Sequence, residues 1–208
     1  MKKIPFYGNL PDDLHCAVAV YKALVEYYFD EIMSWAEAEE FQGFNDGCPG
    51  WNIVPQTKLA SRGIEVRCIE PFDYKKYIKL GDAYLPEICE PEAVKWFVEQ
   101  TLIHDMVPYI DEFEQKVDHQ LRNATIKDVE SMLSDGFLIG TEINAHLLND
   151  QEGFNSHYIL IHGFKDDNFI INDPGLPPQQ NRKVPYQKMR QVIELTDHPN
   201  EVTGFRKS

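Results

Sequence analysis

The spacing of the apolar residues changes near Gly136, and this change constrains the fold more than any other feature of the chain. Before Gly136, most apolar residues recur at helical spacing. After it, Gly, Asn, Asp and Pro separate short β-prone runs at residues 137–140, 157–163, 169–172 and 202–205. Helices followed by antiparallel strands are typical of an α+β fold. We therefore expect a helical region packed on a C-terminal antiparallel β-sheet.

Length and charge narrow the class of protein. A chain of 208 residues, of which 43% are hydrophobic, can bury one substantial core, so we expect a single domain over residues 1–208. The formal net charge is −14, and no cluster of Lys and Arg forms a phosphate-binding stripe, so we expect no nucleic-acid partner. An acidic surface favours basic partners or simply keeps a protein in solution, and the sequence leaves both readings open.

The N-terminus and the cysteines indicate a cytoplasmic protein. The first five residues are basic but lead into Gly, Pro and Asp instead of the apolar stretch of a signal peptide. No run reaches transmembrane length, so we expect no membrane partner, although export without a signal peptide stays open. The four cysteines form no CxxC pair, which argues against a zinc ribbon or a disulfide framework.

Residues 14–29 form the strongest helical pattern, because only three polar residues interrupt the apolar ones. Asp12 or Asp13 can cap this helix. With Asp13 as the N-cap, Cys16 is the third helical residue, where free N–H groups and the helix dipole favour a thiolate. Cys16 is therefore a candidate nucleophile, although a free cysteine taken alone is more often a small buried residue. The buried reading is kept for Cys48, Cys68 and Cys89.

Caps and prolines predict the other elements of the first part. The Ser-x-x-Glu spacing at Ser34 predicts a helix that ends near Gly43, and Thr125 with Asp128 predicts another that ends at Gly136. Further helices are expected over residues 52–62 and from residue 91, and a strand over residues 64–69. Residues 74–85 fit neither pattern clearly.

His157 and Asp173 are candidates for a catalytic base and the group that orients it. His157 opens one apolar run, and Asp173 closes the next. If residues 164–166 form a three-residue loop, His157 lies directly opposite Asp173, with Cβ atoms about 4.5–5.5 Å apart. A slip of one residue would move Asp173 to the other face of the sheet. Asp-Pro-Gly at residues 173–175 is also an ordinary turn sequence.

The remaining histidines are weaker candidates. His162 is a rival base but falls on the opposite face of the strand from His157. His15 is adjacent to Cys16 and points about 100° away around the helix. We expect the others to be surface residues, namely His104, His119, His146 and His198.

With these residues identified, the chain resembles the papain-like cysteine peptidases of the bacteriocin-processing type, family thirty-nine of the cysteine peptidases. Residues 12–16 and the long helix after them resemble the nucleophile segment, and residues 157–164 and 172–175 resemble the His and Asp strands. The stand-alone members are the most similar, because they share an early Trp such as Trp51 and a segment like residues 181–185.

One position departs from the family pattern. The family has a Gln about six residues before the nucleophile as an oxyanion-hole donor, whereas this chain has Leu10 there and Asn9 next to it. Asn9 can supply a side-chain amide if the loop is one residue longer. The usual fusion to a membrane transporter is also missing, so cleavage after double-glycine leaders does not follow from the resemblance.

The resemblance implies a papain-like α+β fold and acyl transfer through a thioester. Cys16 would attack a carbonyl carbon, His157 would move the proton, and Asp173 would fix the imidazole tautomer. We expect a peptide, protein or small amide substrate, with no metal or cofactor. A glutamine deamidase, an acyltransferase or an inactive peptide-binding domain fits the same residues, and a helical interaction protein fits if Asp173 faces away from His157. The sequence leaves the oligomeric state open.

Overall fold

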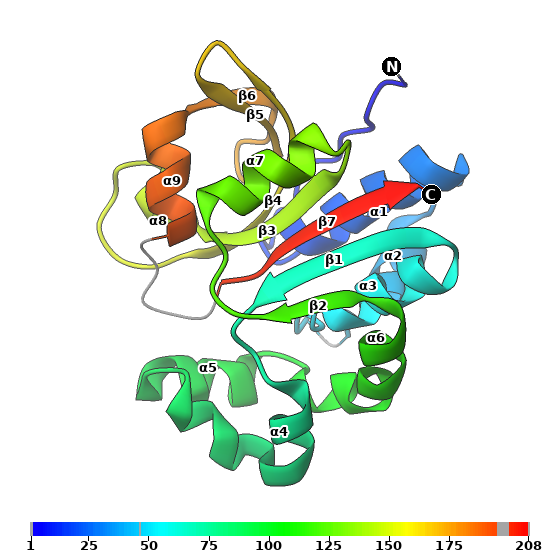
Figure 1. Cartoon of the computed structure of the whole chain (residues 1–208), viewed down its shortest axis with the longest axis vertical. Coiled ribbons are helices and arrows are strands. Elements are labelled where there is room, and N and C mark those ends of the chain that lie inside the picture. The colour runs from blue at the N-terminus through cyan, green and yellow to red at the C-terminus, as the bar shows by residue number, and fades with distance from the viewer. Residues whose placement is uncertain (1, 46, 195–199, 208) are drawn as a thin grey trace.

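A mixed β-sheet runs through the computed structural model, which describes residues 2–45, 47–194 and 200–207. In these residues the sheet has seven strands in the order β2-β1-β7-β3-β4-β5-β6 (Figure 1). The strands are β1 (Ile64–Glu70), β2 (Asp118–Leu121), β3 (Leu138–Asn144), β4 (Ser156–Lys165), β5 (Asn168–Asp173), β6 (Gln179–Pro185) and β7 (Val202–Lys207). The α+β expectation is confirmed.

The sheet is antiparallel except at one edge. There β1 and β2 pair in parallel, and β1 pairs in the antiparallel sense with β7, the last strand of the chain. The sheet is therefore not confined to the C-terminal part, because β1 and β2 come from the mostly helical first part. The sequence did not predict β2 and β6, which are the two edge strands and are polar.

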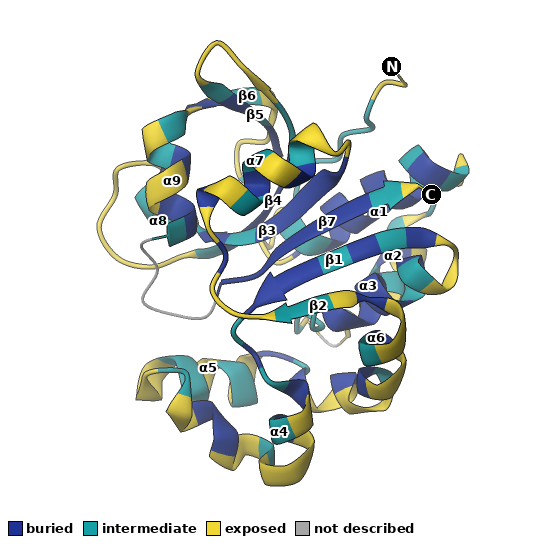
Figure 2. Ribbon diagram, in the orientation of Figure 1, coloured by how far each residue is buried: buried dark blue, intermediate teal, exposed yellow. Residues whose placement is uncertain are grey.

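Helices cover both faces of the sheet. Helices α1 (Cys16–Phe29), α2 (Trp35–Gln42) and α3 (Ile53–Ser61) lie behind it in Figure 1, whereas α7 (Ile126–Ser134) crosses in front. With α7 lie α8 (Ala145–Leu148) and α9 (Tyr186–Glu194). Each face has its own apolar core, one including Tyr21 and Tyr158 and the other Ile159 and Ile171. Figure 2 shows that burial follows the central strands and α1.

A group of short helices lies beside the edge of the sheet formed by β1 and β2, away from α7 and α9 (Figure 1). It contains α4 (Tyr74–Leu80), η1 (Gly81–Glu87), α5 (Pro91–Gln100), η2 (Ile103–Tyr109) and α6 (Ile110–Lys116). Pro91 stands in the first turn of α5, as predicted, and no residue of α5 is fully buried. The ambiguous segment 74–85 is thus helical, divided by Gly81, whose φ is +57°.

The two predicted capping boxes are confirmed. Ser34 and Glu37 form a capping box at the start of α2, and Gly43 ends that helix in the left-handed region. Thr125 and Asp128 form a second capping box, at the start of α7. No helix in residues 2–45, 47–194 and 200–207 is long and apolar enough to cross a membrane.

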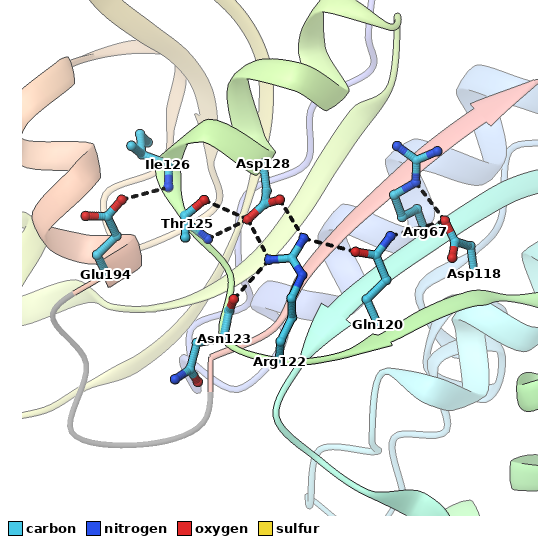
Figure 3. Close-up of polar contacts among 9 residues, drawn as sticks. All are labelled: Arg67, Asp118, Gln120, Arg122, Asn123, Thr125, Ile126, Asp128 and Glu194. Atoms are coloured by element: carbon cyan, nitrogen blue, oxygen red, sulfur yellow. Dashed lines mark hydrogen bonds and ion pairs between the residues drawn. The ribbon is translucent and has the colours of Figure 1, made fainter.

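The connection from β2 to α7 is fixed by polar contacts that Figure 3 shows. Arg122 forms a bidentate pair with Asp128, with N–O distances of 2.6 and 2.9 Å, and also bonds Gln120. Arginine beside the carboxylate lowers the pKa of Asp128 to about 2. Glu194 of α9 accepts the N–H of Ile126 at 3.0 Å, which ties the ends of α7 and α9 together.

Candidate active site

Cys16 is the first residue of α1, two positions earlier in the helix than the capping prediction had it. His15 is the N-cap, and Asp13 has a φ of +61°, so the chain turns sharply before the helix begins. Asp12 and Asp13 therefore do not cap α1, and the capping expectation was wrong. The first N–H to bond within the helix is that of Ala19, to the carbonyl of His15 at 2.9 Å. The N–H of Cys16 thus has no helical partner and is a free donor.

The hairpin that carries His157 and Asp173 has a different register from the predicted one. Its turn has two residues, Asp166 and Asp167, with φ of +51° and +59°, instead of three. If pairing continued from that turn without interruption, Asp173 would lie opposite Leu160, on the wrong face. A bulge at His162 shifts the register by one residue, so that Ile161 pairs with Ile171.

This bulge brings Asp173 to the face that holds His157. Continuing the register places Asp173 opposite Ile159, diagonal to His157 instead of directly across from it. The side chains bridge the diagonal, because Nε2 of His157 lies 2.7 Å from Oδ1 of Asp173. Both are buried, with 7% and 5% of their surfaces exposed. Nδ1 of His157 is left free of Asp173, and the nearby thiol of Cys16 helps to raise the pKa of the imidazole.

Hydrogen bonds shift the pKa values of His157 and Asp173 in opposite directions. Burial by itself lowers the pKa of His157, but hydrogen bonds with Asp173 and Cys16 outweigh it and raise the pKa to about 10. Burial likewise raises the pKa of Asp173, and hydrogen bonds from His157, Gly175 and Arg182 lower it to about 2. His157 is therefore positive and Asp173 negative at neutral pH.

Two residues hold Asp173 in place. Oδ1 also accepts the N–H of Gly175 at 3.0 Å, and Oδ2 accepts Nη1 of Arg182 at 2.7 Å. Arg182 lies on β6 and extends its other nitrogen to Asn149, 2.8 Å away. Oδ1 thus has a donor besides the imidazole, and Oδ2 has Arg182 as its donor. Together these donors fix the plane of the carboxylate. In the sequence, Gly175 and Arg182 stand within longer segments that resemble the family, and no pattern indicated a role for either residue.

Asn9 lies beside the start of α1. Its Oδ1 accepts the N–H of His15 at 2.7 Å and that of Leu10 at 3.0 Å, and its Nδ2 donates to Asp13 at 2.9 Å. The amide oxygen is thus occupied, which orients the NH₂ group and leaves it one hydrogen beyond the bond to Asp13.

Two cavities flank the three residues. The first, of about 150 Å³, has Cys16 in its wall, and the second, of about 360 Å³, has His157 and Asp173. Asp13 and Ser156 line both, so the cavities adjoin along the line from Cys16 to His157.

Comparisons with known proteins give fold similarity alone. No family model and no curated protein matches the sequence. One solved structure, a double glycine motif protease from an AMS/PCAT transporter in complex with the leader peptide, matches with a TM-score of 0.51 and 12% identity, over 99% of this chain and 93% of that one. The chain has the papain-like fold of the double-glycine peptidases.

Two further structures match this papain-like chain over 99% of its length, each with a TM-score of 0.49. One is the peptidase domain of Streptococcus ComA, a bi-functional ABC transporter involved in a quorum-sensing pathway, at 13% identity over 100% of that chain. The other is described as a C39-like peptidase from Bacillus anthracis, at 15% identity over 96% of that chain.

Among the described residues, no other histidine contacts Asp173 as His157 does. His15 is buried between Asp12 and Glu39, with each ring nitrogen 3.0 Å from a carboxylate oxygen. His162 is the bulged residue, and burial lowers its pKa. His104 is exposed, as predicted, but the prediction for His119 was wrong, because its side chain is 8% exposed and contacts Glu114. His146 is half-buried and lines the second cavity, and His198 lies outside the described residues.

Sequence reasoning also missed a group of carboxylates behind Cys16, the side chains of Glu70, Glu142 and Glu201, which line the first cavity. A signal for Glu70 was present, because Ile64, Val66 and Cys68 share its face of the strand, and a charge at the end of an apolar face is unusual. Asn52, at the start of the helix expected over residues 52–62, makes no capping bond and instead donates to Glu201 at 2.9 Å.

Proposed function

We propose that the protein is a cysteine hydrolase that cuts peptide or amide bonds. The observation that carries the proposal is that the buried imidazole of His157 bonds Asp173 at 2.7 Å and is close enough to Cys16 for the thiol to raise its pKa. Cysteine, histidine and an orienting carboxylate in this relation are the parts needed to activate a thiol nucleophile. The papain-like fold supports the proposal, because Cys16 begins a helix beside two cavities.

In the proposed reaction, the thiolate of Cys16 attacks the carbonyl carbon, and its electron pair forms the C–S bond. The carbonyl oxygen becomes an oxyanion, for which the N–H of Cys16 and the side-chain amide of Asn9 are the proposed donors. His157 gives its proton to the leaving nitrogen, and the C–N bond breaks to leave a thioester. A water molecule then gives a proton to His157 and attacks the thioester, which releases the acid and restores Cys16.

The surroundings favour a peptide as the substrate. Leu14 and Trp96 line the first cavity and Leu176 the second, although they are 43%, 37% and 52% exposed. Apolar side chains at the rim of adjoining cavities suit an extended chain with side chains of its own. The structural relative with TM-score 0.51 holds a leader peptide. We therefore place peptides first among the substrates to be tested.

The test measures the reactivity of Cys16 and then the reaction products. Iodoacetamide modification of Cys16, followed by peptide mass spectrometry across pH, is compared between the native protein and His157→Ala. Fast modification well below pH 8 that is lost in the variant supports an activated thiolate. Ordinary thiol behaviour in both proteins contradicts the proposal and leaves a peptide-binding domain as the better account.

Products then separate the reaction classes. A peptide mixture is incubated with the native protein and with Cys16→Ser. New termini that depend on Cys16 support peptidase activity. A gain of one mass unit at Gln, without new termini, assigns the triad to a deamidase, and acyl groups on added amines assign it to an acyltransferase.

A further inference from the structure

The first cavity combines a reactive thiol with buried acid groups. Its volume of about 150 Å³ is below the roughly 300–1,000 Å³ of small-molecule sites, so it suits one side chain better than a whole ligand. Cys16 lies in its wall, and three carboxylates line it: Glu70 of β1, Glu142 of β3 and Glu201, the residue before β7.

The carboxylates differ in how far the protein satisfies them. Glu201 is fully engaged, because Oε2 accepts Asn52 and Oε1 accepts Gln56 at 2.6 Å and Tyr158 at 3.1 Å. Glu142 accepts only the hydroxyl of Ser156, at 2.7 Å.

Glu70 carries an unused oxygen, although only 7% of the residue is exposed. Its Oε1 accepts the hydroxyl of Tyr74 at 2.9 Å and the thiol of Cys68 at 3.3 Å. Its Oε2 has no hydrogen-bond partner among the described residues. A carboxylate oxygen at a cavity wall that accepts no bond from the protein is open to a donor that arrives with a ligand.

The protein supplies no cation to this cavity. Among the described residues, no Lys, Arg or His side chain lines it. His119 approaches Glu70 but does not line the cavity, and its Nε2 stays 3.9 Å from Oε1, beyond hydrogen-bond distance. A metal ion fits poorly as well, because no group of three His, Cys, Asp or Glu side chains in the described part of the chain has the geometry to hold one.

Aromatic rings form the rest of the wall. Trp51 packs on Phe72 with ring centroids 5.0 Å apart, and on Phe97 at 5.3 Å, and all three rings line the cavity. Trp96 lies next to Phe97, at 5.4 Å, and is partly exposed. Aromatic faces bind the apolar stem of a long side chain and also attract a positive charge. Acid groups with aromatic walls therefore match a long basic side chain.

We propose that this cavity binds a Lys or Arg side chain of the substrate next to the bond that Cys16 attacks, with Glu70 and Glu142 as the charged partners. This inference rests on the proposed function, because it assigns the specificity of the same site. Burial raises the pKa of both Glu70 and Glu201; the charge of Glu142 adds to the effect on both, and the charge of Glu201 adds to the effect on Glu70. A cation in the cavity would favour the ionised carboxylates.

The test uses methanethiosulfonate reagents that carry a positive trimethylammonium, a negative sulfonate or no charge. In each, the thiolate of Cys16 attacks the sulfur, forms a disulfide and releases methanesulfinate, and the rate is followed on the Cys16 peptide by mass spectrometry. The neutral reagent reports on the thiol, and the ratio of the cationic to the anionic rate reports on the cavity. The two proposals can therefore fail separately.

We expect a cationic-to-anionic ratio of about 100 or more in the native protein. Glu70→Gln and Glu142→Gln keep their hydrogen-bonding oxygens, and each should lower the ratio about tenfold. Glu130→Gln, on the other face of the sheet, removes the same charge and should leave the ratio nearly unchanged. Equal ratios in all four proteins would overturn the inference, whatever the neutral reagent shows.

A second measurement addresses the substrate itself. Among peptides cut by the native protein, Lys or Arg should be enriched at one fixed position beside the cut bond, and Glu70→Gln should reduce that enrichment. Cleavage without any basic preference would overturn the inference while leaving the proposed function standing. Protection of Cys16 by free butylamine without positional enrichment would assign the cavity to a free amine, and so would also overturn it.

Discussion

Arg182 binds the oxygen of Asp173 that His157 does not use. Nη1 of Arg182 lies 2.7 Å from Oδ2, while Nε2 of His157 lies 2.7 Å from Oδ1. The carboxylate is thus held between an imidazole and a guanidinium, and the arginine itself is anchored to Asn149. This arrangement makes Arg182 a positioning residue, because it acts on His157 only through Asp173.

Replacing Arg182 by Met tests that role. We expect Asp173 to lose its second anchor, with a loss of about 1–3 kcal/mol in the free energy of unfolding. The pKa of Asp173 should rise, and kcat/KM should fall about tenfold on any substrate that is found. Arg190→Met is the matched control, because Arg190 pairs with Glu194 at the surface and its loss should change stability by less than about 0.5 kcal/mol. NMR titration and chemical unfolding provide the readouts, and equal effects of both variants would contradict the role.

The pH dependence follows from His157. Its pKa is raised from 6.5 to about 10, so the stability that it contributes is fully present below pH 6.5 and is lost as the pH rises through about 10. The unfolding free energy of the native protein should therefore fall relative to that of His157→Gln over this window. The rate should fall in the same window, because the leaving nitrogen needs the proton of His157.

Asp173→Asn provides the internal check on this pH profile. Without the carboxylate, the pKa of His157 should decrease and the alkaline limb should move to lower pH. An alkaline limb that stays in place in Asp173→Asn would show that another group controls it.

Gly175 is a second test of how tightly the pair is held. A Cβ atom at this position would lie 3.0 Å from Oδ1 of Asp173 and 3.3 Å from Nε2 of His157. Gly175→Ala should therefore push the two side chains apart and reduce kcat more than tenfold with little change in the fold. At Gly163 the nearest atoms to a Cβ would be 3.6 Å away, an ordinary contact, so Gly163→Ala is the control. Similar activities of the two variants would refute this reading.

Asn9 can be tested as an oxyanion donor while its acceptor bonds are kept. Asn9→Asp keeps an oxygen to accept the N–H groups of His15 and Leu10 but removes the NH₂ donor and its bond to Asp13. We expect kcat to fall about 10²–10³-fold. Alkylation by iodoacetamide forms no oxyanion, so its rate should change much less than kcat. A parallel loss of both rates would mean that Asn9 only supports the start of α1.

Local chemistry made some of the fold predictable. Ser34, Gly43 and Thr125 perform the capping roles that their types favour, and these roles depend only on neighbouring residues. The edge strands β2 and β6 were missed because they are polar and lack apolar alternation. The start of α1 was predicted at the wrong residue because Asp13 adopts a positive φ, which no neighbouring residue indicates.

For the candidate site, the sequence predicted the residue types better than their geometry. His157 and Asp173 do come together, but through a two-residue turn with a bulge instead of the expected three-residue loop. The expected pairing puts Asp173 opposite His157, and the observed pairing puts it opposite Ile159, two residues away. Side chains two residues apart on a strand share a face, so both pairings place His157 and Asp173 on the same face of the sheet. The partners of Asp173 and the carboxylates near Cys16 come from distant segments, and no local pattern encodes such contacts.

The bulge at His162 has a consequence for how this hairpin can change its length. The hairpin of β4 and β5 holds one residue more than its turn and ladder require, and His162 is that surplus residue. Its deletion would make the ladder regular and keep Ile161 paired with Ile171, so His157 and Asp173 would keep their relative positions. Shortening or lengthening of the chain near the turn can thus be absorbed before it reaches His157. The hairpin can therefore change its length near the turn without moving His157 relative to Asp173.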